Sequence, residues 1–181
     1  MGGIDKIKYS MDRAKFITIG YTYRCERKLY EFLKDYNTIY INDNNNNPNL
    51  IQDSDITNKF DNIITDIKSL KRNKIIDNVI GDNISDIEEE EIYYIINLNN
   101  IITPRRRISA HVVSLNTFIQ NLQRDVCDMD IKIILLASTY KSVIEDRFSI
   151  RGGSAPIYAS DLVLSYDDVG DLKIIKSRYV Y

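Results

Sequence analysis

The N-terminal part of the chain alternates between short apolar runs and one amphipathic stretch. Residues Lys15 to Gly20 (KFITIG) are β-branched or aromatic and end in glycine, which is typical of a strand followed by a turn. Between Arg24 and Tyr36 apolar residues recur at intervals of three and four, which predicts a helix with one buried face. A second strand is predicted at Thr38 to Ile41. The simplest geometry for this β-α-β unit is a pair of parallel strands joined by the helix.

The central part predicts two further helices and two buried strands. A helix capped by Asp53 or Ser54 should run to Lys71 and Arg72, because its apolar residues keep the helical spacing. The apolar run YYIINL at residues 93–98 suits a strand covered on both faces. A helix from Ala110 to Leu122 and a strand from Lys132 to Ala137 follow.

The last part predicts a long loop over residues 139–156, with a helical turn within it as an alternative, and strands over 161–166 and 172–176. Strands that alternate with helices predict an α/β domain with a mainly parallel sheet. The whole chain, residues 1–181, is expected to be a single domain, because its length gives no reason for two. Residues 1–14 are expected as an N-terminal extension and residues 42–53 as a flexible polar loop.

Composition limits the classes of function. Hydrophobic residues make up 44% and charged residues 28%, which are globular values, and no apolar run is long enough for a membrane span. Two cysteines and one histidine leave no ligand set for zinc, so no metal site is expected. A net charge of −2 means that any contact with nucleic acid needs a local basic patch. We expect a cytoplasmic protein, because the sequence shows neither an apolar span nor a secretory signal. A virus-associated protein in an infected cell is the alternative, because the bias toward Ile, Asn, Asp, Lys and Tyr is typical of AT-rich coding.

The C-terminal motifs resemble a known family. A strand IILLAS, a loop containing RGGSAP, a strand DLVLSY and a final KIIKSRY occur in this order. This order resembles the C-terminal half of a RecA-like ATPase core of the recombinase or ring-helicase type. The resemblance implies a three-layer RecA-like fold, a P-loop NTPase ancestry, oligomeric assembly and a role in recombination or replication.

The same resemblance implies a phosphate-binding loop after the first strand, and the sequence departs from it. The family pattern G-x-x-x-x-G-K-[ST] would start at Gly20, which puts Cys25 at the second glycine, Glu26 at the lysine and Arg27 at the hydroxyl residue. At about 4 Å and an effective dielectric constant of about 20, replacing the lysine by glutamate turns an attraction of roughly 4 kcal/mol into a comparable repulsion. The alternative is that Gly20 only ends a strand.

Two further positions depart from the family. The strand YYIIN ends in Asn97, where the resemblance implies an aspartate that holds magnesium through water. An amide supplies no negative charge, so magnesium affinity should fall. After IILLAS the family's polar sensor position is Thr139. Together these changes are those of a fold retained after the loss of ATP hydrolysis, a pseudo-ATPase, and no catalytic residue or cofactor is predicted.

Other motifs point to nucleic acid and to a neighbouring subunit. The resemblance assigns Gly152 and Gly153 to the second DNA-binding loop and Lys176 and Arg178 to a trans-acting pair that reaches a neighbour's nucleotide. Arginines in the two loop regions can neutralise phosphates: they are Arg105, Arg106, Arg107, Arg147 and Arg151. The alternatives are a β-turn without a ligand, solvated charge at the C-terminal end, and a surface cluster of salt bridges.

Three hypotheses follow. The first is a catalytically degenerate RecA-like subunit of a nucleic-acid-processing assembly, whose partners are a RecA-like or other assembly subunit and single-stranded nucleic acid. The second is an active recombinase or helicase subunit with an atypical phosphate loop, which alone would require ATP and magnesium. The third is a structural or interaction protein that uses the fold with neither nucleotide nor nucleic acid.

Overall fold

Seven strands form one sheet at the centre of the molecule, in the order β2-β3-β4-β1-β6-β7, with β5 paired to β4. The computed structural model describes residues 2–41, 53–80, 91–101, 112–141, 148–167 and 169–179. The strands are β1 Phe16–Tyr21, β2 Thr38–Ile41, β3 Tyr93–Asn97, β4 Lys132–Lys141, β5 Phe148–Ile150, β6 Leu162–Tyr166 and β7 Leu172–Ser177. The helices are α1 Gly3–Arg13, α2 Glu26–Leu33, α3 Asp53–Ile80, α4 Val112–Met129 and α5 Ala155–Ala159, with 3-10 turns η1 Tyr23–Cys25 and η3 Leu98–Asn100.

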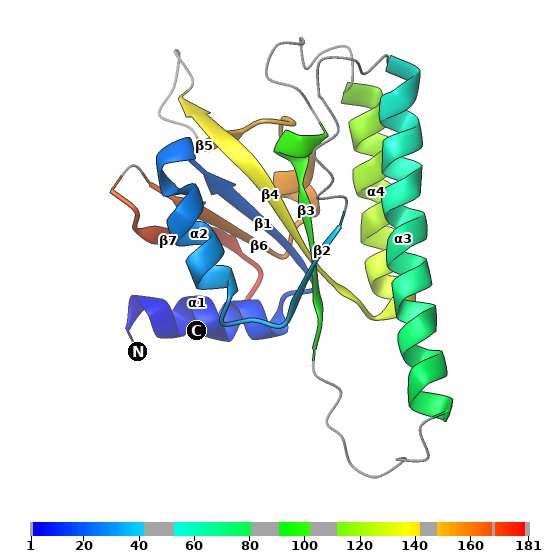
Figure 1. The fold of residues 1–181 in the computed structure, drawn as a ribbon. Coiled ribbons are helices and arrows are strands. Elements are labelled where there is room, and N and C mark those ends of the chain that lie inside the picture. Colours follow the sequence, from blue (N-terminus) through cyan, green and yellow to red (C-terminus); the bar gives the residue numbers. More distant parts are fainter. Residues whose placement is uncertain are drawn as a thin grey trace.

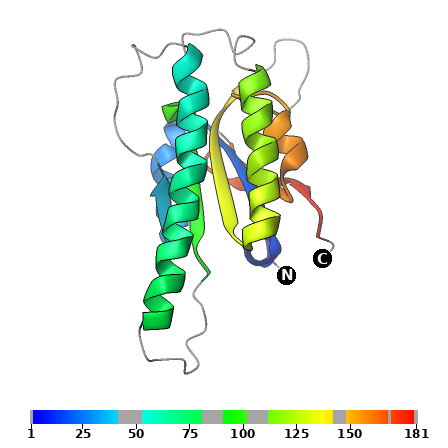
Figure 2. The same cartoon turned by 90° about the vertical axis from the view of Figure 1, so that its right-hand side faces the viewer.

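The expected α/β architecture is confirmed. Strands β2, β3, β4, β1 and β6 are parallel, whereas β7 runs antiparallel to β6 and β5 antiparallel to β4. Helices α1 and α2 lie on one face of the sheet, and α3, α4 and α5 lie on the other (Figures 1 and 2). The chain therefore has three layers.

The pairing of the first two strands differs from the expectation. The structure keeps β1 and β2 parallel but puts β4 and β3 between them. Every residue of β1 and of β3 is buried, whereas β2 is mostly half-buried or exposed. The most apolar strands thus take the central positions, and the more polar β2 lies at the edge.

Alternating side chains of the strands build a core on each face. Ile17, Ile19 and Ile95 belong to the core under α1 and α2, whereas Phe16 and Ile96 belong to the core under α3, α4 and α5. This division follows from the two-residue period of a strand. In the second core, Phe60 of α3 stacks on Phe118 of α4 with ring centroids 4.2 Å apart, which fixes the two helices against each other (Figure 2).

The ends of the chain and its helices refine the sequence predictions. Residues expected as an N-terminal extension form α1, which buries Ile7 and Met11 against the sheet. Helix α2 is shorter than predicted because residues Tyr23–Cys25 form η1, and α3 is longer because it continues to Ile80. The polar segment 42–52 lies outside the described residues, and Asp53 already begins α3.

The prediction for residues 139–156 is wrong where it expects a loop at β4 and β5, whereas the helical turn that it allowed is present as the start of α5. Strand β4 continues to Lys141, β5 pairs with it antiparallel, and α5 begins at Ala155. Thr139 faces Ile150 and Lys141 faces Phe148 in this pairing. Residues 142–147 between the two strands lie outside the described residues. The β-branched and aromatic residues of both arms suit a strand pair, which the intervening polar residues conceal in the sequence.

Candidate functional site

The carboxyl ends of the parallel strands bring together three of the predicted positions. Gly20 of β1 is in register with Ala137 of β4, and Asn97 of β3 is in register with Leu136 of the same strand. Thr139 lies two residues after Ala137 on β4. In sheets of this type the carboxyl edge is where ligands bind, so this edge is the first candidate site.

Asn97 lies in a hydrogen-bond network, the Tyr21–Asn97 network, made of Tyr21, Tyr30, Asn97, Asn99 and Ser138. The Asn97 amide nitrogen donates to the hydroxyls of Tyr21 and Tyr30, both at 3.3 Å, and its oxygen accepts the Asn99 backbone N–H at 3.0 Å. The Asn99 amide donates to Tyr21 at 2.8 Å and accepts the Ser138 backbone N–H at 3.2 Å.

The network is neutral and internally satisfied. Burial raises the pKa of Tyr21, so its hydroxyl stays protonated at neutral pH. Both polar atoms of the Asn97 side chain are bonded to the protein itself. No group of three or more His, Cys, Asp or Glu side chains that could hold a metal ion is found among the described residues.

The first turn, after β1, is closed by its own hydrogen bonds. The Cys25 N–H donates to the Thr22 carbonyl at 2.9 Å, which makes the tight turn η1 in place of a wide loop. The Cys25 thiol is buried and donates to the Asp167 carbonyl at 2.9 Å, so the turn is tied to the β6–β7 connection. Glu26 begins α2, and Arg27 points outward in an ion pair with Glu31.

Close packing around Gly20 leaves no room for a side chain at this position. A Cβ atom on Gly20 would lie 2.6 Å from the Phe148 ring, 2.8 Å from the Thr139 methyl group and 3.0 Å from Ile150. The β4–β5 hairpin therefore crosses the end of β1 in close contact. Thr139, expected as a sensor, takes part in this contact through its methyl group.

The glycine pair after β5 makes a turn into α5. Gly152 and Gly153 have φ values of 108° and 78°, in the region that favours glycine. A Cβ atom on Gly152 would lie 3.1 Å from Leu115 and 3.3 Å from Leu98, whereas Gly153 has open space. The backbone N–H of Arg151 donates to the Ser138 carbonyl at 2.8 Å, so this segment is anchored beside the carboxyl edge.

Lys176 and Arg178 lie toward the amino end of β6, away from the carboxyl edge. Lys176 pairs with Val163 near the start of β6, while Gly20 pairs with Ser165 near its end. The Lys176 ammonium donates to the carbonyls of Ile157, Tyr158 and Ser160 at 2.9, 3.1 and 2.9 Å, and burial lowers its pKa. Arg178 forms an ion pair with Asp161 at 3.1 Å.

Four of the predicted arginines, Arg105, Arg106, Arg107 and Arg147, lie outside the described residues. Sequence reasoning missed Tyr21, Tyr30, Asn99 and Ser138, which complete the network around Asn97. The repeat Asn97-x-Asn99 directly after a buried strand was the available signal for Asn99. Tyr30 gave no such signal, because it approaches Asn97 only through the placement of α2.

The fold is similar to a solved structure of an ATPase domain, with a TM-score of 0.51 and 10% sequence identity. The similarity covers 97% of this chain and 82% of that domain, and it shows a RecA-like α/β fold. No protein-family model matches the sequence, and no curated protein matches it. No helix in the described part of the chain is long and apolar enough to cross a membrane.

Proposed function

We propose that this protein is a catalytically degenerate RecA-like subunit of a nucleic-acid-processing assembly in recombination or replication. The observation that carries the proposal is the Tyr21–Asn97 network, in which neutral side chains bond to one another at the carboxyl edge of a RecA-like sheet. The similarity in fold to an ATPase domain supports the ancestry.

Three features of the first turn argue against tight ATP binding by this chain. Cys25 is committed to the Asp167 carbonyl, Glu26 brings a negative charge to the start of α2, and Gly20 is packed under Phe148. A nucleoside triphosphate needs free backbone N–H groups and a cation at this first turn. We therefore propose that the chain needs no cofactor of its own.

In this proposal the protein acts through its loops and its C-terminal strand. Arg105, Arg106, Arg107, Arg147 and Arg151 are proposed to contact the phosphates of a single strand, with Gly152 and Gly153 allowing close approach. Lys176 and Arg178 are proposed to face a RecA-like neighbour, and their present bonds to α5 and Asp161 would have to rearrange for that contact.

A thermal-shift titration with ATP and magnesium tests the loss of nucleotide binding. We expect no stabilisation from nucleotide bound at the first turn. A ligand present at about 100 times its Kd would add roughly 2.7 kcal/mol of stability, so a saturable shift would favour an active ATPase instead. The controls are a titration with ADP and a titration with magnesium in the absence of nucleotide.

Anisotropy of a labelled single-stranded oligonucleotide across a salt series tests the basic loops. We expect affinity to fall with salt, and we expect a variant with Arg105, Arg106 and Arg107 changed to alanine to bind more weakly with a smaller salt slope. Arg124→Ala is the matched control, because Arg124 is exposed on α4. Equal binding by the triple variant and the control would contradict the proposed role of these arginines.

A further inference from the structure

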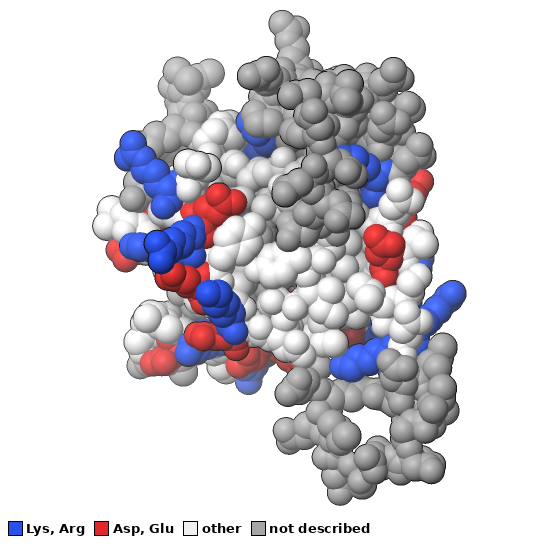
Figure 3. Space-filling view, viewed as in Figure 1, with Lys and Arg blue, Asp and Glu red and all other residues white. Residues whose placement is uncertain are grey.

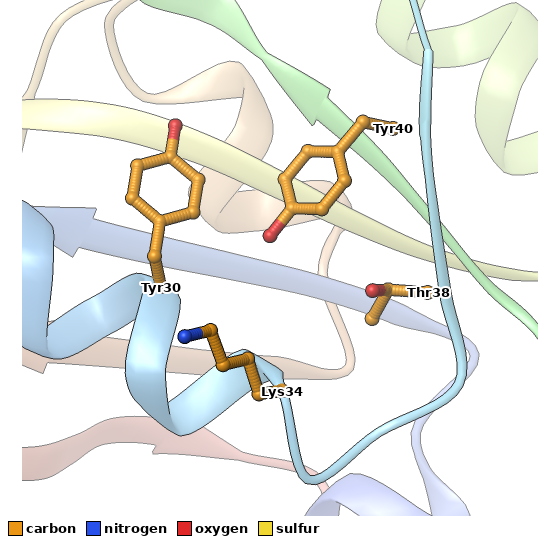
Figure 4. Close-up of a pocket in the computed structure, with 4 residues that line it drawn as sticks. All are labelled: Tyr30, Lys34, Thr38 and Tyr40. Atoms are coloured by element: carbon orange, nitrogen blue, oxygen red, sulfur yellow. The ribbon is translucent and has the colours of Figure 1, made fainter.

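A small pocket lies on the α1 and α2 face of the sheet, at its β2 edge. It has a volume of ≈ 310 Å³ and is lined by Tyr30 and Lys34 from α2 and the residue after it, and by Thr38 and Tyr40 from β2 (Figure 4). Helix α2 and strand β2 are consecutive in the chain, but β3 and β4 separate β2 from β1. The pocket lies between this helix and the edge strand.

The surface around the pocket differs from that of α2. Figure 3 shows an uncharged surface beside α2, bordered on the helix side by a row of Lys, Arg, Asp and Glu side chains. On the edge strand β2, 37% of Tyr40 is exposed. An exposed aromatic face can contact a planar ligand.

The two tyrosines form an aromatic corner. Their ring centroids are 5.8 Å apart and the ring planes are inclined by 44°, so the rings diverge and each keeps a face toward the pocket (Figure 4). Tyr30 is held in place because its hydroxyl accepts a hydrogen bond from Asn97 at 3.3 Å. The corner is therefore preorganised by the Tyr21–Asn97 network.

A single cation completes the pocket. Lys34, at the C-terminal end of α2, extends toward the space between the tyrosines (Figure 4). Among the described residues its ammonium group has neither an ion-pair nor a hydrogen-bond partner, whereas the nearby Glu31 is paired with Arg27. The Thr38 hydroxyl adds a neutral donor and acceptor.

The geometry points to one nucleotide unit as the ligand, and we propose that this pocket binds it with the base against Tyr40 and the phosphate on Lys34. Aromatic faces stack on any base, and a lysine ammonium pairs with one phosphate group. The volume is at the lower end of ligand pockets, about 300 to 1,000 Å³, which suits a single unit. The unit can come from a free nucleoside monophosphate or from a single strand, since both present the same chemistry.

Calorimetric titration of the full chain with UMP, AMP and an oligothymidylate tests this site. We expect Tyr40→Ala and Lys34→Ala each to weaken binding roughly tenfold, and we expect Tyr40→Phe to retain binding because the ring remains. Tyr23→Ala and Lys8→Ala are matched controls, since both residues are exposed and lie outside the pocket.

Binding of the monophosphates alone would identify a free nucleotide, and tight binding only of the oligonucleotide would identify a single strand. Equal binding of an abasic oligonucleotide, or equal affinities of Tyr40→Ala and Tyr23→Ala, would overturn the proposal, as would no binding of any probe. An acidic peptide that binds through Lys34 where all nucleotides fail would assign the pocket to a protein partner instead. ATP also carries a base and phosphates, so the thermal shift that tests the proposed function is repeated with Tyr40→Ala: a shift that this variant loses belongs to the pocket, and one that it keeps belongs to the carboxyl edge.

Discussion

At the residue scale, two buried tyrosine hydroxyls differ in their partners. The Tyr93 hydroxyl donates to the Met11 carbonyl at 3.3 Å, which ties β3 to α1. The Tyr36 hydroxyl is buried and has no hydrogen-bond partner in the described part of the chain. Burial raises the pKa of Tyr36 to about 12. The Tyr36 hydroxyl therefore destabilises the fold, whereas the Tyr93 hydroxyl stabilises it.

Tyr36→Phe should therefore leave the free energy of unfolding unchanged or raise it, whereas Tyr93→Phe should lower it by about 1 kcal/mol. Urea unfolding followed by circular dichroism measures both. The two substitutions remove the same atom, so each serves as the control for the other. A loss for Tyr36→Phe as large as that for Tyr93→Phe would show that the Tyr36 hydroxyl has a partner.

Gly20→Ala tests whether Gly20 is explained by packing. The added methyl group would lie 2.6 Å from the Phe148 ring and 2.8 Å from Thr139, so either the hairpin or β1 must move. We expect a loss of about 1 to 3 kcal/mol in the free energy of unfolding. Gly3→Ala is the control, because nothing lies within 4 Å of its added atom. Equal stability of the two variants in urea would mean that the hairpin moves without cost.

The sequence predicted part of the site at this scale. Gly20, Asn97 and Thr139 were named from the resemblance to RecA-like cores, and the structure puts the three at one edge of the sheet. Their hydrogen-bond and packing partners could not be predicted. Tyr30 reaches Asn97, and Phe148 reaches Gly20, only after helices and hairpins have packed.

At the element scale, Lys176 holds the end of α5. Its ammonium donates to three carbonyls at the C-terminal end of this short helix, where a positive charge is favourable. We expect Lys176→Met to lower the free energy of unfolding by about 1 to 3 kcal/mol, because it leaves these carbonyls without their donor. Arg178→Ala should cost less than about 1 kcal/mol, since its ion pair is half exposed.

Urea unfolding of both variants distinguishes a structural role from a trans-acting one. If Lys176→Met unfolds at the same urea concentration as the unmodified protein, the three hydrogen bonds contribute nothing, and the residue is available for a neighbouring subunit.

The turn between β6 and β7 depends on an exposed carboxylate. Asp167 accepts hydrogen bonds from the Lys173 ammonium at 2.6 Å and from the backbone N–H groups of Asp171 and Val169 at 2.9 and 3.1 Å. The Lys173 hydrogen bond, followed by that of Asp171, holds the pKa of Asp167 below its usual value. Because the folded-state pKa is depressed, the stabilisation is present above the unfolded value of about 3.9 and is lost as pH falls through the folded value.

Asp167→Asn should therefore lose stability at neutral pH and depend less on pH in the acid range. The urea midpoints of the two proteins, measured between about pH 6 and about pH 2, should converge at the acid end. Asp171→Asn is the control, because Asp171 contributes its backbone to this turn. A constant difference between Asp167→Asn and the unmodified protein over the whole range would contradict the assignment.

The elements themselves could largely be predicted from the sequence, with two informative exceptions. Long apolar periodicities identified α3 and α4, and continuous apolar runs identified β3 and β4. Helix α1 was missed although Ile4, Ile7 and Met11 stand at helical spacings of three and four, and Ile7 and Met11 are buried. Strand β5 was missed because its pairing with β4 depends on a hairpin and not on a local pattern.

At the scale of the whole molecule, the residues predicted to contact nucleotide are found toward opposite ends of the strands. Gly20, Asn97 and Thr139 are at the carboxyl edge, while Lys176 and Arg178 are near the amino end of β6. Because β7 runs antiparallel to β6, its last residues lie away from the carboxyl edge, and one copy of the chain does not bring these two sets together. The proposed joint action of the two sets would therefore need a second subunit.

Three residues at the carboxyl edge are each in contact with a different element. Cys25 is bonded to the β6–β7 connection, Gly20 is packed under the β4–β5 hairpin, and Asn97 is bonded to α2 through Tyr30. Three separate elements thus occupy the region around the first turn. Writing the RecA-like phosphate-loop motif into the first turn should therefore not create nucleotide binding, because the surrounding contacts remain.

The variant with Cys25→Gly, Glu26→Lys and Arg27→Ser tests this expectation, since it writes the complete G-x-x-x-x-G-K-[ST] pattern from Gly20. We expect it to show no larger thermal shift with ATP and magnesium than the unmodified protein, and to be less stable because the bond from Cys25 to Asp167 is lost. Cys25→Gly alone is the matched control for that loss of stability. If the triple variant gains a saturable shift with ATP, these three residues alone prevent nucleotide binding at the first turn. The rest of the carboxyl edge is then able to support it.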